Sequence, residues 1–343
     1  MKKLLNFVLL LTVTAIFMPV LTVGFALEQQ TEQSAEVFET DSVISENTLV
    51  QQARPSYDET TSITLFRQGE VEELSLKDYL TGVLAAEMPA GFPEEALKAQ
   101  AVAARTYTLY KQRLYHGESA PESHQGADLC DDPAHCEAYA DLETQAETLW
   151  GESHERYRQR IADAVDATDG IILVYEEEPI AAVFCAASGE KTENAEEIWG
   201  SALPYLVSVD SPGGADCSQY EGTKRVPQQQ FVKLIRERWP DADFSEPPTA
   251  WFRDSHRTQA GSIVDVLVGG VRVSGSEVRQ VLGLNSANFK VRVEEDELVF
   301  TTIGYGHGVG LSQYGARYMA IAGERYDQIL QHYYPGTELQ LQG

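Results

Sequence analysis

The sequence predicts an α+β fold: a single globular domain in which β-hairpins and helices surround a groove, behind an N-terminal membrane segment. Two kinds of pattern support this prediction. Apolar and polar residues that alternate around glycine turns predict hairpins, and apolar residues at helical spacing after capping residues predict helices. The chain has 343 residues, of which 43% are hydrophobic, and this is ample for a buried core.

The charge of the chain excludes one class of partner. Its 26 basic and 53 acidic residues give a net charge of −27. Such a field repels a phosphate backbone, so we expect no nucleic-acid partner.

Residues 1–27 carry no charge after Lys3, and two lysines precede this apolar run. The run is long enough to cross a hydrocarbon core of ~30 Å, with the lysines on the cytoplasmic side. A cleaved signal peptide is the alternative, because Gly24-Phe25-Ala26 offers small residues for a peptidase. We favour an uncleaved anchor, since the run exceeds the ~7–15 residues of a signal peptide core. The protein is then single-pass in the cell membrane, with the rest of the chain extracytoplasmic.

Residues 28–61 are acidic and polar and lack a sustained apolar period, which is typical of a flexible linker. The globular domain is expected over residues 62–343.

The domain is predicted to begin with a hairpin, TSITLFRQGEVEELSL, followed by a helix that Ser75 and Asp78 cap. Apolar residues recur along this helix at helical spacing, and Glu87 falls on the same stripe. Pro89 disfavours helical geometry at Met88, so Glu87 is expected in the last turn.

Glu87 is a candidate general acid. Partial burial and the negative end of the helix dipole both penalise its charged form, which raises the pKa of the carboxyl group toward the range useful at neutral pH. The alternative is a glutamate paired with a nearby Lys or Arg, or a solvated one.

A second helix is expected from Pro93, which takes the first helical position, with Glu94 and Glu95 in the first turn. Its many alanines predict close packing. Gln100 and Arg105 are its conspicuous polar members, and Arg105 by itself is compatible with a surface or ion-paired residue.

A metal-ligand pattern follows in HQGADLCDDPAHCEAY, which contains His124, Cys130, His135 and Cys136. Imidazole and thiolate are the ligands that zinc prefers, and four of them predict a closed, structural site. A Cys130–Cys136 disulfide is the alternative, and three ligands with a water would make a catalytic zinc instead. The remaining cysteines, Cys185 and Cys217, either pair or leave Cys185 as a buried free thiol.

The second half of the chain is predicted to hold a hairpin ending at Ser188-Gly189, a hairpin turning at Gly269-Gly270, a short helix in GSEVRQVLGL and a helix ending near Gly323. Glycines alternate with Tyr305, His307 and Val309 in GYGHGVG, a spacing that lets the backbone lie under a flat ligand.

Four blocks of sequence together resemble the stage II sporulation protein D family, also called the SpoIID/LytB domain family. They are LKDYLTGVLAAEMPAGFPEEALKAQAVAARTYTL, SGEKTENAEEIWGSALPYLVSV, VRQVLGLNSANF and GYGHGVGLSQYGARYMA, in the family's order. The resemblance implies a peptidoglycan lytic transglycosylase that cleaves between N-acetylmuramic acid and N-acetylglucosamine in glycan strands without stem peptides, leaving 1,6-anhydro ends.

The resemblance also implies site residues. Glu87 corresponds to the family's catalytic glutamate and Arg105 to its helix arginine, and the zinc-binding members carry ligands that match the four here. The residues expected to hold the sugar are Gln100, Arg105, Ser188, His307, Gln313 and Tyr314.

Two other functions stay open. One is a non-catalytic glycan-binding module that activates a partner amidase, and the other is a zinc-dependent wall hydrolase. For the sporulation members, the resemblance implies a membrane-bound amidase/endopeptidase and a multipass membrane scaffold as partners during forespore engulfment.

Overall fold

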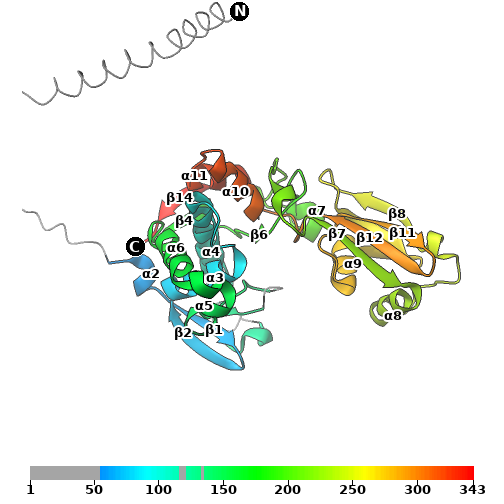
Figure 1. Cartoon of the computed structure of the whole chain (residues 1–343), viewed down its shortest axis with the longest axis horizontal. Coiled ribbons are helices and arrows are strands. Elements are labelled where there is room, and N and C mark those ends of the chain that lie inside the picture. Colours follow the sequence, from blue (N-terminus) through cyan, green and yellow to red (C-terminus); the bar gives the residue numbers. More distant parts are fainter. Residues whose placement is uncertain (1–54, 116–120, 133–134) are drawn as a thin grey trace, which may run out of the picture. The chain divides into compact units, whose positions relative to one another are not determined.

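The structure is a computed structural model that describes residues 55–115, 121–132 and 135–343, all within one compact unit, Arg54–Gly343. The predicted anchor and most of the predicted linker lie outside the described residues. Within the described residues, no helix is both long and apolar enough to cross a membrane. The observed fold is a mixed α+β one (Figure 1).

The α-helices are α2 (Tyr57–Thr60), α3 (Leu76–Glu87), α4 (Glu94–Leu114), α5 (Leu142–Trp150), α6 (His154–Asp166), α7 (Ala195–Trp199), α8 (Gln228–Arg238), α9 (Gly275–Leu282), α10 (Gln313–Ile321) and α11 (Tyr326–Tyr333). The strands are β1 (Ser62–Arg67), β2 (Glu70–Ser75), β3 (Leu129–Cys130), β4 (Ile171–Tyr175), β5 (Glu178–Pro179), β6 (Phe184–Cys185), β7 (Glu221–Pro227), β8 (Phe252–Arg257), β9 (Ile263–Val268), β10 (Val271–Ser274), β11 (Phe289–Glu294), β12 (Glu297–Ile303), β13 (Leu311–Ser312) and β14 (Glu338–Leu341).

The first hydrophobic core surrounds α4, whose alanines are all fully buried. Because alanine has a short side chain, α3, α6, α10 and α11 all approach this helix closely. Pro93 caps α4 one residue before the helix, rather than occupying its first position, because its backbone is extended with a ψ of 147°.

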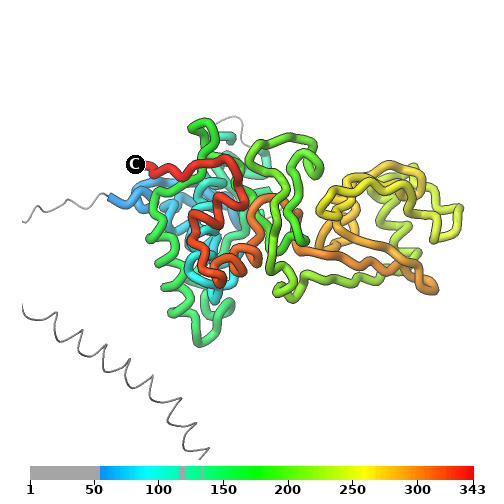
Figure 2. Tube along the Cα trace, turned by 90° about the horizontal axis from the view of Figure 1, so that it is seen from above, coloured from blue at the N-terminus to red at the C-terminus, as the bar shows by residue number. Residues whose placement is uncertain are grey.

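The expected hairpin at β1 and β2 is confirmed, and β3 joins it in parallel to give the order β2-β1-β3. A second sheet has the order β14-β4-β5 and brings the C-terminal strand beside β4. Figure 2 shows this red C-terminal segment beside the first described residues. Gly170 lies between the two: its carbonyl accepts a bond from the Gln342 N–H, and a Cβ on it would lie 3.1 Å from the Tyr57 Cβ.

The predicted strand ending at Ser188-Gly189 is wrong. The hairpin partner of β4 is the short β5, which ends at Pro179, a residue with no N–H for a longer ladder. The chain then leaves this sheet, and β6 pairs in parallel with β13, more than a hundred residues further along.

The second hydrophobic core lies within residues 226–300. It joins two three-stranded sheets, β11-β12-β7 and β10-β9-β8, to α8 and α9. Phe231 is at the centre of a cluster of aromatic rings that includes Trp251 and Phe300. The expected hairpin turn at Gly269-Gly270 and the short helix after it are both confirmed.

Candidate functional site

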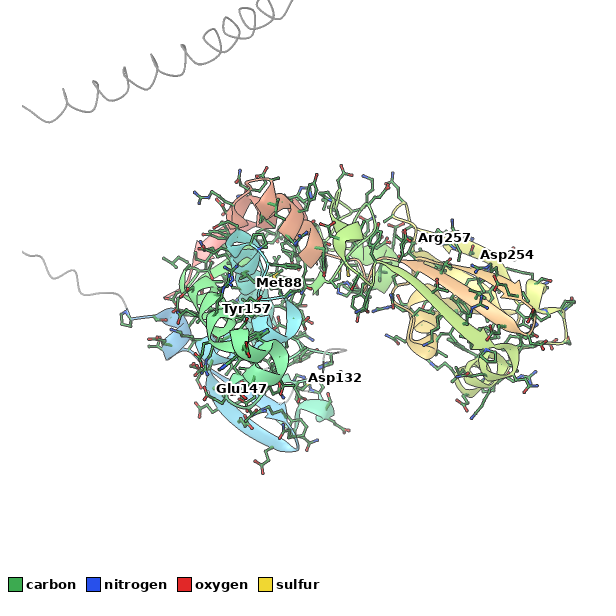
Figure 3. The ribbon with its side chains drawn as sticks, viewed as in Figure 1. Met88, Asp132, Glu147, Tyr157, Asp254 and Arg257 are labelled. Carbon is green, nitrogen blue, oxygen red and sulfur yellow. The ribbon has the colours of Figure 1, made fainter. Side chains whose placement is uncertain are left out.

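Glu87 is the last residue of α3, as predicted. Met88, labelled in Figure 3, caps the helix in an extended conformation, with a φ of −125° and a ψ of 135°. This is the geometry that a following proline imposes on the residue before it. The expected N-terminal cap is also present, because the Ser75 hydroxyl accepts a bond from the Asp78 N–H at 3.0 Å.

The Glu87 carboxylate is half-buried and receives one hydrogen bond from the protein. The Ala138 N–H donates to its Oε1 at 2.8 Å. Among the described residues, no lysine, arginine or histidine forms an ion pair with it, which excludes the paired alternative for this part of the chain. Burial raises the pKa of Glu87, and the Ala138 N–H offsets only part of that effect.

Glu87 lines a cavity of about 540 Å³. The cavity has carboxylates, aromatic rings, two imidazoles and one guanidinium in its wall. Its lining residues are Glu87, Tyr107, His135, Cys136, Glu137, Val183, Phe184, Cys185, Ala186, Trp199, Arg279, Tyr305, Gly306 and His307.

Glu137 is a second carboxyl group in this wall, and it is 2% exposed. The Thr108 hydroxyl donates to its Oε2 at 3.1 Å and the Tyr79 hydroxyl at 3.4 Å. Its Oε1 is buried without a protein partner. Burial and the nearby charge of Glu87 raise the pKa of Glu137 well above its ordinary value. Two acids with pKa values raised by burial therefore lie in the wall of one cavity.

His307 is the one residue predicted to hold sugar that lines the cavity. Its Nδ1 accepts a bond from the Val309 N–H at 3.1 Å, which assigns the ring proton to Nε2. Burial and the charge of Arg279 lower the pKa of His307 to about 4, so the ring is neutral at pH 7. It lies 5.2 Å from the ring of Trp199, which is 46% exposed.

The alternating glycines around His307 have a different role from the one predicted. A Cβ on Gly310 would lie 2.1 Å from the Val183 carbonyl oxygen, and one on Gly306 would lie 2.7 Å from the Cys185 Cβ. Both residues also have positive φ, at +72° and +117°. The glycines therefore let the loop between β12 and β13 pack against the segment around β6, and of the alternating set only Gly306 reaches the cavity wall.

The four predicted metal ligands lie together. Their ligand atoms are all within 4.8 Å of one another. His124 Nε2 is 2.9 Å from His135 Nδ1 and 3.4 Å from the Cys136 sulfur, and the Cys130 sulfur is 3.6 Å from His135 Nδ1. A zinc tetrahedron with bonds of about 2.0–2.3 Å has edges of roughly 3.3–3.8 Å. The two sulfur–nitrogen distances fall in that range and the two imidazole nitrogens lie closer, so small shifts of these side chains would let the four donors hold a zinc ion.

Other contacts around the cluster agree with that fit. The second ring nitrogen of His124 lies 3.2 Å from the Ala127 carbonyl oxygen, a contact that orients a metal-bound imidazole. All four cysteines are free thiols, so neither disulfide considered from the sequence is formed. The cluster also adjoins the cavity. His135, Cys136 and the following Glu137 line its wall, and the Ala138 N–H bonds to Glu87.

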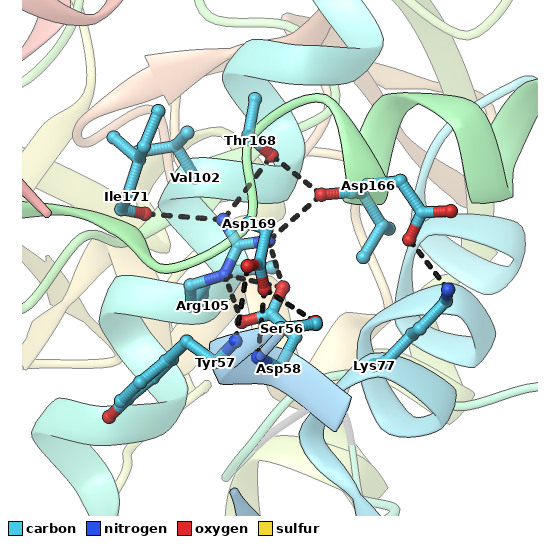
Figure 4. A network of polar contacts seen from close by, with 12 residues as sticks. Ser56, Tyr57, Asp58, Lys77, Val102, Arg105, Asp166, Thr168, Asp169 and Ile171 are labelled. Carbon is cyan, nitrogen blue, oxygen red and sulfur yellow. Dashed lines mark hydrogen bonds and ion pairs between the residues drawn. The ribbon is translucent and has the colours of Figure 1, made fainter. Parts of the chain in front are cut away.

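Arg105 does not line the cavity. Its guanidinium is fully buried, and its Nε donates to Asp58 at 2.8 Å (Figure 4). Its remaining N–H groups donate to Thr168 and to backbone carbonyls of Val165 and Ile171. The expectation that Arg105 holds the sugar is corrected: the side chain joins α2 to α4 and the start of β4. Because Asp58 is 1% exposed, the compact unit begins before residue 62.

Four other residues predicted to hold sugar also lie outside the cavity wall. The Gln313 amide donates to Gln100 at 3.4 Å, and both are buried where α10 packs on α4. Ser188 is buried beside Ser312, and the Tyr314 ring contacts the edge of Phe92. These contacts are internal packing.

Glu137, Trp199 and Arg279 are cavity residues that the sequence did not single out. Glu137 directly follows a predicted zinc ligand, and that proximity was the available signal. Trp199 and Arg279 belong to segments distant in sequence from Glu87, and no spacing rule connects them.

Comparisons with known proteins identify the family of the chain. The profile of the SpoIID family, described as stage II sporulation protein, matches residues 67–175. The chain is 39% identical over 283 residues to "Stage II sporulation protein D" of Bacillus subtilis, covering 81% of this chain and 78% of that protein. It is 37% identical over 290 residues to the protein of that name from Bacillus amyloliquefaciens, covering 84% and 81%.

A further relative is named "Amidase enhancer", also from Bacillus subtilis. It is 28% identical over 311 residues, which cover 76% of this chain and 40% of that protein. The match at 37–39% identity over most of both chains is decisive: this chain belongs to the SpoIID family of stage II sporulation proteins.

Proposed function

We propose that the protein is a lytic transglycosylase that cleaves the bond from N-acetylmuramic acid to N-acetylglucosamine in peptidoglycan strands without stem peptides. The observation that supports this best is Glu87, a half-buried carboxyl group with a raised pKa and no ion-pair partner among the described residues, in the wall of a large cavity. A general acid needs these properties.

One acid suffices for the reaction because no water takes part. Protonated Glu87 donates its proton to the glycosidic oxygen, and the bond from that oxygen to the muramoyl C1 breaks. The muramoyl C6 hydroxyl attacks C1 and loses its proton to the Glu87 carboxylate. The product is a 1,6-anhydro ring, and Glu87 is again protonated. An ordinary glycosidase instead uses two carboxylates and a water.

Nearby groups support each half of this cycle. The Ala138 N–H bonds to the Glu87 carboxylate and holds it in one orientation for both proton transfers. Glu137 adds a second acid to the same desolvated space, which disfavours ionisation of the pair together. His307 is neutral with both nitrogens directed by backbone groups, so it serves to position the loop rather than to move a proton.

Exposed aromatic rings suit a sugar substrate. Trp199 is 46% exposed and Tyr305 is 36% exposed, and both line the cavity. Their faces offer apolar contact to the C–H surface of a pyranose ring.

His124, Cys130, His135 and Cys136 would hold a structural zinc ion. A zinc ion bound by all four would join two segments of the loop after α4 and supply folding free energy. We assign it no step in the reaction, because four protein ligands complete the tetrahedron and leave no position for a substrate or water.

The relative named "Amidase enhancer" supports a second candidate function, in which the chain binds glycan and stimulates a cell-wall amidase. A pure activator does not need an acid in a desolvated cavity, so Glu87 favours the enzyme. The two roles are compatible. We further propose that the protein acts in forespore engulfment as a single-pass membrane protein, with a membrane-bound amidase/endopeptidase and a multipass scaffold.

The test is incubation of the full-length chain, and of a Glu87→Gln variant, with peptide-free glycan strands, followed by mass spectrometry. The transglycosylase yields muramoyl ends lighter by one water than reducing ends, and the variant yields none. Reducing ends would indicate hydrolysis and favour a zinc-dependent hydrolase. Intact strands that remain bound to both proteins would favour the activator.

A further inference from the structure

Arg279 has no part in the reaction described above, yet it lies in the same cavity wall as Glu87. It is the one lysine or arginine among the described residues that line this cavity. Its positive charge acts on two groups in this wall: it adds to the effect of burial that lowers the pKa of His307, and it offsets part of the rise that burial causes in the pKa of Cys185. A strand bound against Glu87 therefore meets a guanidinium within the same cavity.

The position of Arg279 is fixed by the ends of its helix. At the start of α9, a Cβ on Gly275 would lie 2.1 Å from the Ile263 carbonyl oxygen, so the helix sits directly on β9. At the other end, the Leu284 N–H donates to the Arg279 carbonyl at 2.9 Å. The Arg279 Nε in turn donates to the Leu284 carbonyl at 3.3 Å. This pair of bonds holds the Arg279 side chain at Nε and uses none of its terminal N–H groups.

The guanidinium has no carboxylate partner in the described part of the chain. No ion pair to Arg279 is formed there, and its bond to Leu284 uses only Nε. This is unexpected in a protein with 53 acidic and 26 basic residues. The side chain is half-buried, and desolvation lowers the pKa of Arg279, so its charge is kept in the cavity at a cost. An anionic ligand would offset that cost.

The proposed substrate carries one suitable anion. Each muramic acid bears a lactyl ether whose carboxyl group is an amide while a stem peptide is attached. Removal of the peptide at that amide leaves a free carboxylate on an otherwise neutral sugar chain. Resting on the proposed function, we infer that the terminal N–H groups of Arg279 bind this lactyl carboxylate and select strands from which the peptide has been removed.

The chemistry of arginine suits this task better than that of lysine. Its planar fork matches a carboxylate with two parallel bonds, whereas an amide at the same place offers no charge and only one acceptor oxygen. A hydrogen bond to a charged group contributes enough to change affinity about ten- to a hundredfold.

The test compares two forms of the same peptide-free strands: one with lactyl carboxylates and one in which they have been converted to carboxamides. The two differ in charge and scarcely in size. Dissociation constants are measured by calorimetry for the full-length Glu87→Gln protein, with and without Arg279→Gln. We expect the parent to bind the carboxylate form about ten- to a hundredfold more tightly. With Arg279→Gln, both forms should bind as weakly as the carboxamide binds the parent.

Two further variants separate recognition from folding. Arg236→Gln removes an exposed arginine whose Nε also donates to a carbonyl at 3.3 Å, outside the cavity wall, and should leave the preference unchanged. Arg279→Lys keeps the charge without the fork and should retain a reduced preference. If thermal unfolding shows that Arg279→Gln does not fold, Arg279→Lys replaces it in the binding comparison.

The inference is overturned if the parent binds both strands equally or binds neither, or if its preference survives Arg279→Gln. Failure of the proposed function gives a different result, because wild-type protein would leave the carboxylate strands uncleaved. If the protein does not cleave the strands but prefers the carboxylate form through Arg279, the role of Arg279 is still supported, as a property of glycan binding.

Discussion

The Ala138 N–H donates to the Glu87 carboxylate at 2.8 Å, and this bond joins the end of α3 to the loop that holds the four zinc-type ligands. Ala138 follows Cys136 by two residues, so the shape of that loop determines where the bond to the acid is made. The proposed general acid and the cluster of predicted metal ligands are therefore mechanically connected, although we propose no chemical step for a bound metal.

We predict that loss of the metal lowers stability and activity together. Chelation, or a His124→Ala substitution, should lower the midpoint of thermal unfolding and the zinc content by mass spectrometry, because the loop loses its cross-link. Cleavage should fall as the Ala138 N–H leaves Glu87. Loss of cleavage with an unchanged unfolding midpoint would contradict this and indicate a catalytic metal.

Glu87→Gln should reduce cleavage of peptide-free strands by about a hundred- to ten-thousandfold, the usual contribution of a general acid. Glu87→Asp is the matched control, since it keeps the acid and moves it by one methylene. It should retain more activity than Glu87→Gln. Equal residual rates in both variants would show that the carboxyl group is not the proton donor.

The pH dependence follows from the raised pKa of Glu87. Cleavage needs the protonated form, so kcat/KM should fall as the pH rises through that pKa. The free energy of unfolding that Glu87 contributes also falls as the pH rises. The folded state binds this proton more tightly than the unfolded state, so its contribution is complete below the unfolded pKa and is lost as pH rises through the folded pKa.

Glu87→Gln should therefore unfold at higher denaturant concentration than wild type at pH 7, and the difference should vanish in acid. A variant less stable than wild type at pH 7 would contradict the direction of the pKa shift.

Asp58→Ala should lower the free energy of unfolding by about 3–5 kcal/mol, because it leaves the buried Arg105 guanidinium without its partner. The neighbouring Glu59→Ala is the control. Glu59 is exposed and pairs with Lys77 at 3.1 Å, so its loss should cost about 0–1 kcal/mol in urea unfolding. A protein that begins at residue 62 should be destabilised like Asp58→Ala, and equal stability of the two substitutions would refute the role of the ion pair.

Trp199→Ala should raise KM for glycan about three- to tenfold with little change in kcat, since the lost aromatic contact is worth about 0.5–1.5 kcal/mol. Tyr318→Ala removes an aromatic ring of similar exposure, 49%, that does not line the cavity. Steady-state kinetics on both variants test this prediction. An equal rise in KM for the two would mean that the Trp199 ring does not contact the sugar.

Local features of this protein were predictable because short-range chemistry decides them. Pro89 ends α3 and so places Glu87 in the last turn. Ligand type and spacing identified His124, Cys130, His135 and Cys136, which the fold brings within 4.8 Å. The first hairpin, the Gly269-Gly270 turn and α9 follow likewise from turn and capping residues.

Long-range pairing was not predictable in the same way. The strand expected to end at Ser188 was assigned from its apolar run, but β6 finds its partner in β13. Arg105 gave no sign of its partner either, because Asp58 is 47 residues away in what the sequence suggested was a linker.

The sequence by itself thus determined the position of the helix-end acid, the set of candidate metal ligands and the family. Only the tertiary structure decided which polar groups face the cavity and which are buried between helices. It buried Gln100, Arg105, Ser188 and Gln313 and left Tyr314 partly buried outside the cavity wall. It also brought Glu137, Trp199 and Arg279 into one cavity wall with Glu87. The physical reason is that propensity and capping act over a few residues, whereas burial depends on which distant segments pack together.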